Sequence, residues 1–407
     1  MVKVLRSFVR GPLAPYVAGF AEELLRQGYT RTSAEQHVCF IAHLDRWMSA
    51  EGLRLDELGA SVVERYLAER RSVGYVEYRS VKAMRPLLEF LTPLGVLPDP
   101  EEVPLGPVED LLDQYHDYLL TERGLTSATA RGYVDWVRPF VQGRLRDDRL
   151  DLAGLRAADV TGYVLVSCSG RATGSAKMVV CALRSLLRWL HLTGMVPVPL
   201  APAVPSVAGW KLTGLPKALT PEELRRLLAA CDRRTRTGRR DYAIVLMLAR
   251  LGLRAGEVAC LGLDDIDWRH GEILVTGKGS RAERLPLPHD VGVAISAYLR
   301  RGRPGSAHGR TIFIRAKAPH RSLTSSGVSA VVHDAAQRAG LGTVHAHRLR
   351  HTAATAMLRA GSPLAEVGQV LRHRSPLTTA IYAKVDRDAL AVLARPWPKV
   401  AAAGGRS

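Results

Sequence analysis

Long apolar runs, cysteines and acidic side chains are all scarce in this chain of 407 residues. No run approaches the roughly 18 apolar residues that a membrane-spanning helix needs, and residues 1–6 lack the continuous apolar core of a signal peptide. The five cysteines are odd in number, widely spaced and mostly set among apolar neighbours, which argues against a disulfide framework or a zinc cluster. We therefore expect a soluble, intracellular protein with reduced thiols, no metal and no membrane partner.

The shortage of acidic residues leaves a strongly basic chain. It holds 57 Lys and Arg against 39 Asp and Glu, which gives a net charge of +18 and a pI near 10.1. Such a balance predicts a polyanionic partner, with nucleic acid as the first choice and an anionic membrane surface as the weaker alternative. With 47% hydrophobic residues the chain can bury real cores. At roughly 100–200 residues per domain, its length predicts two to four domains.

The first half contains an internal repeat. Residues 84–98 align without gaps on residues 183–197 at an offset of 99, and Gly28 and Gly124 mark matching helix ends further upstream. The alternative is chance similarity between two Leu-rich amphipathic helices, but separated anchors keep nearly the same offset. We therefore predict two helical units of about 100 residues in tandem.

A change of composition separates this half from the rest. Residues 198–215 are rich in Pro and Gly and read as a linker, after which Thr220 and Glu223 form a capping box with Pro221 at the first helical position. The expected fold is mainly α with a small β-sheet. The expected domains are 1–105 (helical, DNA-binding-like), 106–197 (helical), 198–215 (linker) and 216–407 (catalytic).

The last domain is predicted to be helical around one hairpin. Residues 241–251 form a nearly continuous apolar segment, long enough for a buried helix. Residues 272–276 and 283–287 read as two strands joined by a Gly-rich turn, and a helix is expected from about 324 to 338.

Basic side chains in this domain are spaced to bind an anion. His347 and Arg350 are three residues apart, so on a helix they lie on one face and can contact the same anion. A phosphodiester under attack gains negative charge on its non-bridging oxygens, and forked guanidinium donors such as Arg254 and Arg350 suit that geometry. His347 and His373 can add hydrogen bonds or accept a proton.

Two further residues complete a reaction. Lys278, at the tip of the hairpin, is placed to protonate a departing sugar oxygen. Ser375 and Pro376 predict a helix start that brings Tyr382 close to His373, and neighbouring cations would make its phenolate more accessible. Tyr382 is therefore the expected nucleophile. In isolation it would be read as a half-buried aromatic, and Lys278 as a solvated loop charge.

Two other interpretations of these residues compete with the catalytic interpretation. Arg254 could be only the ion-pair partner of Glu257. His347 and His351, four residues apart, could suggest a metal site, but no carboxylate or cysteine ligand set lies nearby in the sequence. We expect neither metal nor cofactor.

The ordered set of motifs resembles the catalytic domain of the tyrosine recombinases, the phage-integrase family. The first-arginine motif of that family matches Gly252–Glu257, with Glu257 in a supporting role, and the hairpin lysine matches Lys278. The His-x-Leu-Arg-His-Thr motif matches residues 347–352, and the later motif matches residues 371–373 followed by Tyr382. The resemblance covers about residues 213–395.

The resemblance implies a mechanism and an assembly. Attack by tyrosine would leave a 3′-phosphotyrosyl link and a free 5′-hydroxyl, and a partner strand would reverse the step without ATP or metal. Four protomers on two specific DNA sites are implied, with an accessory recombinase or directionality factor as a further partner. Residues 106–197 sit where the family places its SAM-like core-binding domain, which closes a clamp around DNA. The implied setting is the prokaryotic cytoplasm at the nucleoid.

Two features depart from the family pattern. Arg372 replaces the usual glycine before His373, where glycine would permit a left-handed turn at low cost, and an added phosphate contact is expected from its side chain. The extra helical copy at residues 1–100 is hypothesised to grip flanking DNA or another protomer.

Further phosphate contacts are expected outside the motifs, with a solvated charge run as the alternative reading. The candidates are Arg233, Arg234, Arg236, Arg239 and Arg240. A type IB topoisomerase, or a DNA-binding protein that has lost catalysis, remains an alternative to a recombinase, integrase or tyrosine-type transposase.

Overall fold

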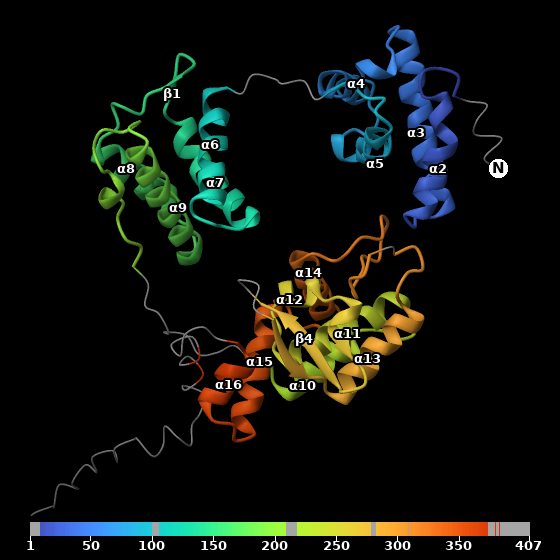
Figure 1. Ribbon diagram of the computed structural model, residues 1–407, viewed down its shortest axis with the longest axis vertical. Coiled ribbons are helices and arrows are strands. Elements are labelled where there is room, and N and C mark those ends of the chain that lie inside the picture. The colour runs from blue at the N-terminus through green and yellow to red at the C-terminus, as the bar shows by residue number, and fades with distance from the viewer. Residues whose placement is uncertain are drawn as a thin grey trace, which may run out of the picture. The chain divides into compact units, whose positions relative to one another are not determined.

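The computed structural model describes residues 9–99, 106–208, 218–277, 282–307, 309–372, 379 and 382 (Figure 1). Helices dominate it, accompanied by a two-stranded and a three-stranded antiparallel sheet. The prediction of a mainly α fold with a small sheet is confirmed. By their contacts residues 101–213 form one compact unit, and residues 1–100 group with residues 214–407 in the other.

The N-terminal helices enclose a core of their own. Phe20, Leu44 and Met48 are among its buried side chains. Thr30 caps the longest helix by accepting a hydrogen bond from the Ser33 backbone N–H. The helices are α2 (Val17–Arg26), α3 (Arg31–Ala50), α4 (Ala60–Ser72) and α5 (Val81–Leu91).

The unit of residues 101–213 repeats this order of four helices. Thr126 caps its second helix as Thr30 does in the first set, and Gly28 and Gly124 both adopt positive φ just before the capped helix. Tyr115 and Trp189 lie in its core. The elements are α6 (Pro107–Thr121), α7 (Ser127–Gln142), β1 (Leu145–Arg146), β2 (Arg149–Leu150), α8 (Ala157–Cys168) and α9 (Thr173–Leu192).

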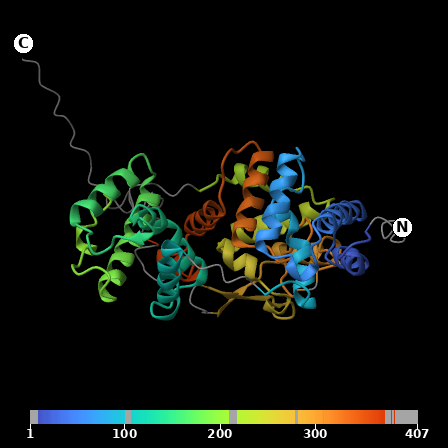
Figure 2. The same ribbon diagram turned by 90° about the horizontal axis from the view of Figure 1, so that it is seen from above.

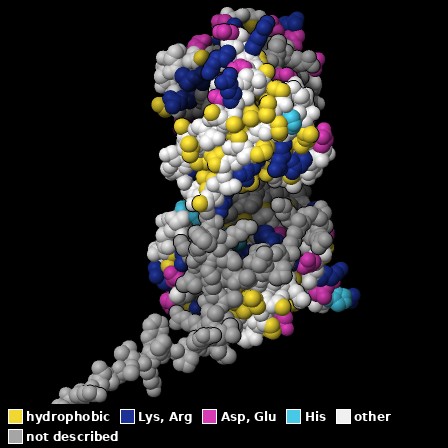
Figure 3. Space-filling model, turned by 90° about the vertical axis from the view of Figure 1, so that its left-hand side faces the viewer, with side chains coloured by type: hydrophobic (Ala, Val, Ile, Leu, Met, Phe, Trp, Pro, Cys, Tyr) yellow, Lys and Arg dark blue, Asp and Glu magenta, His cyan; other side chains and the backbone are white. Residues whose placement is uncertain are grey.

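The segment expected to be a linker is partly packed. Leu200 and Val204 are buried in the core of residues 101–213, and the Arg184 guanidinium donates to Val204 O at 2.8 Å. The prediction that the linker starts at residue 198 is therefore wrong, because the apolar side chains of this Pro-rich stretch are covered. Figure 3 shows further apolar side chains gathered on one outer face of this unit.

The third set of helices builds the largest core around α11. Its Ile244, Met247 and Leu248 are fully buried. The elements are α10 (Pro221–Ala229), α11 (Arg236–Leu251), α12 (Ala255–Cys260), β3 (Ile266–Asp267), β4 (Glu272–Thr276), β5 (Ala282–Pro286), α13 (His289–Arg301), α14 (Ser325–Arg338), α15 (Ala346–Arg359) and α16 (Leu364–Val370). Thr220 and Glu223 form the expected capping box.

The sheet of this set has the order β3-β4-β5, and the last two strands form the expected hairpin. Ile273 and Val275 are buried in the core, and the residues that alternate with them along β4 are more exposed, as strand alternation requires. Figures 1 and 2 show the sheet on the surface, with helices behind it.

Gly252 lets α11 turn sharply into the next helix. It has φ of +59° at the C-cap, and a Cβ added there would lie 2.5 Å from Leu371 Cδ2. Only glycine combines this backbone with so close a neighbour. The turn therefore places Arg254 next to the chain that follows α16.

Charge is distributed unevenly along the chain. Residues 1–213 contain 25 Lys and Arg and 24 Asp and Glu, whereas residues 214–407 contain 32 and 15. Nearly all of the net positive charge therefore belongs to the part that carries the site motifs. Among the helices of the described residues, none combines the length and apolarity needed to cross a bilayer.

Thr352 ties the start of the third set of helices to α15, which gives a stability prediction. Its buried hydroxyl accepts from the Leu219 backbone N–H at 2.9 Å and donates to Arg348 O at 2.9 Å. Thr352→Val leaves that N–H unpaired, so we expect a loss of about 1–3 kcal/mol in the free energy of unfolding, measured by denaturant titration.

Thr355→Val is the matched control. The Thr355 hydroxyl is also buried on α15 and has no hydrogen-bond partner within the described residues, so its replacement should cost little or stabilise the protein. Equal losses for both variants would contradict the importance of the Leu219 bond.

Candidate active site

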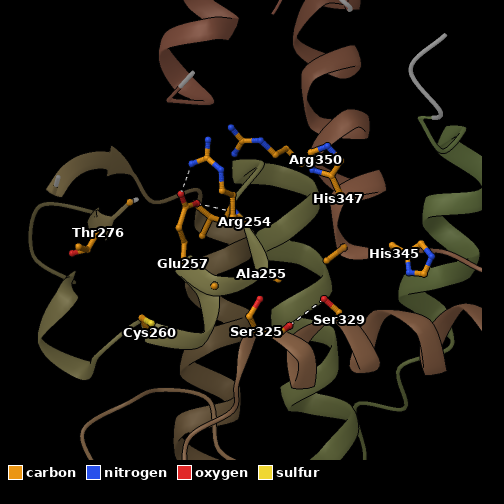
Figure 4. Close-up of a pocket in the computed structure, with 14 residues that line it drawn as sticks. Arg254, Ala255, Glu257, Cys260, Thr276, Ser325, Ser329, His345, His347 and Arg350 are labelled. Carbon is orange, nitrogen blue, oxygen red and sulfur yellow. Dashed lines mark hydrogen bonds and ion pairs between the residues drawn. The ribbon is translucent and has the colours of Figure 1, made fainter. Parts of the chain in front are cut away.

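Three of the predicted site residues meet in one cavity. Arg254, His347 and Arg350 line a cavity of about 580 Å³ between the start of α12, the start of α15 and the end of β4 (Figure 4). The first of these lies almost a hundred residues before the others in the chain. The fold therefore brings both predicted guanidinium clamps and one imidazole together.

Glu257 anchors Arg254. The Arg254 backbone N–H donates to Glu257 Oε2 and its guanidinium donates to Oε1, each at 2.7 Å. The Arg254 side chain is 41% exposed, while that of Glu257 is 4% exposed. Burial acts to raise the pKa of the Glu257 carboxyl, but the backbone hydrogen bond and the charges of Arg372 and Arg254 outweigh it and hold this pKa below its usual value. Ion pairing and a place in the cavity are thus compatible for Arg254.

Arg350 lies deeper than Arg254. Arg350 is 1% exposed, and its guanidinium donates to Gly252 O at 2.5 Å and to Leu371 O. Burial, together with the nearby Arg254 charge, lowers its pKa to about 10, so it remains cationic at neutral pH. A guanidinium has five N–H groups, so these two bonds leave donors for an anion in the cavity.

His347 contacts His351 edge to face, and His351 in turn contacts the Tyr382 ring. The ring centroids of the two histidines are 4.5 Å apart, and the His351 ring lies 5.3 Å from that of Tyr382. Desolvation and the Arg350 and Arg254 charges lower the pKa of His347, and burial lowers that of His351 to about 4. Both rings are therefore neutral near pH 7, and His351 contacts the rings of both His347 and Tyr382.

Tyr382 is packed beside the cavity and is not one of its lining residues. It is 2% exposed and contacts a small apolar cluster with Ala354, Val367 and Leu371. Burial raises the pKa of its phenol, and the charge of Arg350 only partly opposes this. The expectation that nearby cations make the phenolate more accessible is therefore wrong for this conformation, because the loss of hydration outweighs the attraction.

Two predicted site residues lie outside the described residues. These are Lys278 and His373. Ser375 and Pro376, which were expected to start a helix, also lie outside the described residues. Thr276 and Gly277, which directly precede Lys278, line the cavity. The end of β4 therefore lies at the cavity, and the role of Lys278 stays a prediction.

The predicted DNA-binding arginines around residue 236 form no part of the cavity. Arg236 begins α11 and Arg254 follows its end, so about 22 Å of helix separates the two. Arg233 lies over the Tyr242 ring and Arg234 pairs with Asp232. Arg236 is exposed and Arg239 donates to Arg301 O.

Arg240 is a correction to that set. It is 7% exposed and donates to Asp241 Oδ1 and to Ile314 O. Because its donors are occupied inside the core, it cannot contact a phosphate on the surface.

Arg372 is also not a surface contact. Its side chain is 5% exposed and donates to Glu257 Oε2 at 2.7 Å. The expected phosphate contact is therefore replaced by a buried ion pair. The sequence offered one signal for this residue, namely an arginine at a position where the motif has glycine.

Three other cavity residues were not anticipated. They are Cys260 at the end of α12 and Ser325 and Ser329 on α14. No spacing rule links these three to the motif residues, so only the fold could reveal them. His345, which precedes α15 and lies two residues before His347, also lines the cavity.

The comparisons with known proteins agree with this geometry. The model of the phage integrase family matches residues 217–388. A protein of Sinorhizobium fredii (strain NGR234) named as an integrase/recombinase, y4rA, is 43% identical over 393 residues, 95% of either chain. The chain belongs to the phage integrase family of tyrosine recombinases. Tyrosine recombinase XerD of Mycobacterium tuberculosis is 33% identical over 297 residues, which are 69% of this tyrosine recombinase and 94% of XerD.

Solved structures share the fold. A lambda integrase dimer bound to a COC′ core site matches with a TM-score of 0.54 at 17% identity, covering 81% of this chain and 91% of that one. XerH site-specific recombinase bound to palindromic difH substrate matches with a TM-score of 0.53 at 18% identity, covering 81% and 93%. The chain is thus longer than XerD and close to the full length of y4rA.

Proposed function

We propose that this tyrosine recombinase cuts and rejoins DNA at a specific site, with Tyr382 as the nucleophile and Arg254, His347 and Arg350 as the groups that bind the scissile phosphate. The observation that carries the proposal is the meeting of these three side chains in one cavity, with the Tyr382 ring two aromatic contacts away. The family membership supplies the reaction class.

The geometry supports transfer of a phosphoryl group between two oxygens. The Tyr382 oxygen attacks phosphorus, and the bond to the 5′ oxygen breaks, which leaves a 3′-phosphotyrosyl ester. Arg254 and Arg350 stabilise the extra negative charge on the non-bridging oxygens, and neutral His347 donates a hydrogen bond or takes the phenolic proton. Lys278 protonates the leaving 5′ oxygen, and His373 adds a donor to the phosphate.

The second step reverses the first. A 5′-hydroxyl from a partner strand attacks the phosphotyrosyl ester and releases Tyr382. Because the ester retains the energy of the broken bond, the two steps need no external energy source. In the described conformation Tyr382 is buried with a raised phenol pKa, so DNA binding must expose it before attack.

The partner is double-stranded DNA, bound by several copies of the chain. The concentration of positive charge in residues 214–407 supports a phosphate-backbone contact there. A lambda integrase tetramer bound to a Holliday junction shares the fold, with a TM-score of 0.51 at 18% identity, and a tetramer on two synapsed sites is our proposal for this chain. We place its action in the prokaryotic cytoplasm at the nucleoid, with an accessory recombinase or directionality factor as a further partner.

Mapping of covalent junctions tests the function. Protein is incubated with DNA fragments from its native locus, trapped, and the position of each protein–DNA junction is sequenced. Junctions at one fixed site, with 3′ linkage, are the expected result. Junctions scattered over any supercoiled plasmid that the protein relaxes would instead indicate a type IB topoisomerase. A bound but never trapped complex would indicate a DNA-binding protein without catalysis.

The helices α2–α5 are proposed to contact a second protomer rather than flanking DNA. Their part of the chain is near neutral, and exposed arginines such as Arg54, Arg65 and Arg71 pair with acidic neighbours. Deleting residues 1–100 should leave the length of the DNase footprint unchanged and reduce assembly of the multimeric complex in sedimentation. A shortened footprint with normal assembly would contradict the proposal.

A further inference from the structure

Arg372 has an unfavourable backbone conformation, and contacts of its side chain must offset the energy cost. Its φ is +55°, in the left-handed region that glycine adopts freely and that costs energy for a residue with a Cβ. Its backbone N–H donates to Gln369 O at 2.8 Å, in the turn that ends α16. The backbone preference of arginine therefore opposes this conformation, so other contacts must stabilise it.

The side chain makes a buried ion pair. Arg372 Nη2 donates to Glu257 Oε2 at 2.7 Å, and the two side chains are 5% and 4% exposed. Nη1 donates to Val370 O at 3.1 Å, and Nε–H has no partner within the described residues. Within the described residues, Glu257 is thus the acidic partner of Arg372.

The same carboxylate holds Arg254, so three residues form one cluster. Oε1 of Glu257 accepts from the Arg254 guanidinium, while Oε2 accepts from the Arg254 backbone and from Arg372. The carbonyl of Arg372 also accepts from Arg254 Nη2 at 3.4 Å. We call Arg254, Glu257 and Arg372 the arginine–glutamate cluster.

We propose that Arg372 is a positioning residue for strand cleavage, which joins the chain after α16, on the way to Tyr382, to the turn that carries Arg254. This rests on the proposed function of the cavity. His373 directly follows Arg372 and Tyr382 lies ten residues on, so the cluster fixes the start of the segment that bears the nucleophile.

Loss of Arg372 should make the site sensitive to acid. Within the described residues, the charged and titratable groups that act on the Glu257 carboxyl or line the cavity with it are Arg254 and Cys260 at the two ends of α12, Arg372 after α16, His345 before α15, and His347 and Arg350 on α15. Arg372 is one of the charges that keep the Glu257 pKa below its usual value. Without it the carboxyl takes up a proton at higher pH, and a neutral carboxyl holds Arg254 less firmly.

Arg372→Gly is the decisive variant, because glycine accepts the left-handed backbone and removes only the side chain. Single-turnover cleavage of a duplex that carries the recombination site is measured from acid to alkaline pH, together with DNA affinity. We expect cleavage at neutral pH to fall by about 10-fold, the acid limb of the rate profile to move to higher pH, and DNA affinity to stay within about twofold. Arg372→Lys should restore much of the acid limb because it retains the charge.

Other results would overturn the proposal. An unchanged rate profile in Arg372→Gly would show that Glu257 does not depend on Arg372. A loss of DNA affinity, with a log-log salt slope smaller by about 1, would make Arg372 a phosphate contact. Glu257→Gln should make the further removal of Arg372 nearly without effect on cleavage, since the cluster is already broken; full additivity of the two losses would count against it.

A measurement without DNA separates this proposal from the function itself. The carboxyl carbon of Glu257 is titrated by NMR in the free protein. Its pKa should rise in Arg372→Gly and return in Arg372→Lys, whether or not the protein cleaves DNA. If the wild-type protein formed no covalent complex with DNA, the proposed function would be wrong. The NMR titration of Glu257 would still decide whether Arg372 acts on that carboxyl.

Discussion

Tyr382→Phe should abolish the covalent capture of DNA. Removing a catalytic nucleophile lowers rates by about 10⁴–10⁶-fold, because no other group forms the same intermediate. Folding should be retained, since phenylalanine keeps the ring contact with His351 and the packing against Leu371 and Val367. The yield of protein–DNA adduct is read on a denaturing gel, and binding is read by gel shift.

Tyr242→Phe is the matched control. Tyr242 is a partly buried tyrosine in the same domain, beneath Arg233 and outside the cavity, so its change should leave capture within about twofold of wild type. A Tyr382→Phe protein that still forms a 3′-linked adduct would disprove the assignment of the nucleophile.

Arg254→Ala should slow cleavage by about 10²–10³-fold, the loss typical for one preorganised donor to a developing oxyanion. The fold should tolerate it, because Glu257 keeps its bond to Arg372 and Arg254 is itself 41% exposed. Arg254→Lys should rescue little, since a single ammonium cannot match a forked guanidinium. Single-turnover rates on a duplex carrying the recombination site measure both effects.

Arg250→Ala provides the comparison for Arg254. Arg250 lies four residues earlier on α11, is exposed and pairs with Asp290 on the surface. Its loss should change the cleavage rate less than about twofold and thermal stability slightly. If Arg254→Ala were no slower than Arg250→Ala, the cavity would not be the site of phosphate binding.

Spacing rules located the parts of the site that depend on local geometry. The meeting of Arg254, His347 and Arg350 followed from ordered motifs, and the capping box at Thr220 and the hairpin from turn chemistry. Each of these depends on residues that are close in sequence or on a motif already tied to a fold.

What the sequence could not supply was burial. Tyr382 was expected to have an accessible phenolate, but its raised pKa depends on side chains of α15 and α16 that pack around it. Arg240 follows several exposed arginines, and only Asp241 and the distant Ile314 O show that it points inward. Arg240 and Ile314 are 74 positions apart in the chain, so a local pattern cannot encode their contact.

Arg372 lies between these cases. The usual glycine of the motif would permit a left-handed turn there, and the structure has that turn at φ of +55° although the residue is an arginine. The side chain was expected to reach DNA because arginines near a phosphate site often do. Instead Glu257, more than a hundred residues earlier, binds it inside the domain.

The uneven charge of the chain also affects its approach to a duplex. Attraction over distances beyond contact depends on net charge, and residues 214–407 carry almost all of it. Residues 214–407 therefore contribute most of the steering toward DNA, at a rate that falls as salt is added. Residues 1–213 contribute little to this attraction, so their contacts depend on short-range packing, which dissolved ions weaken far less.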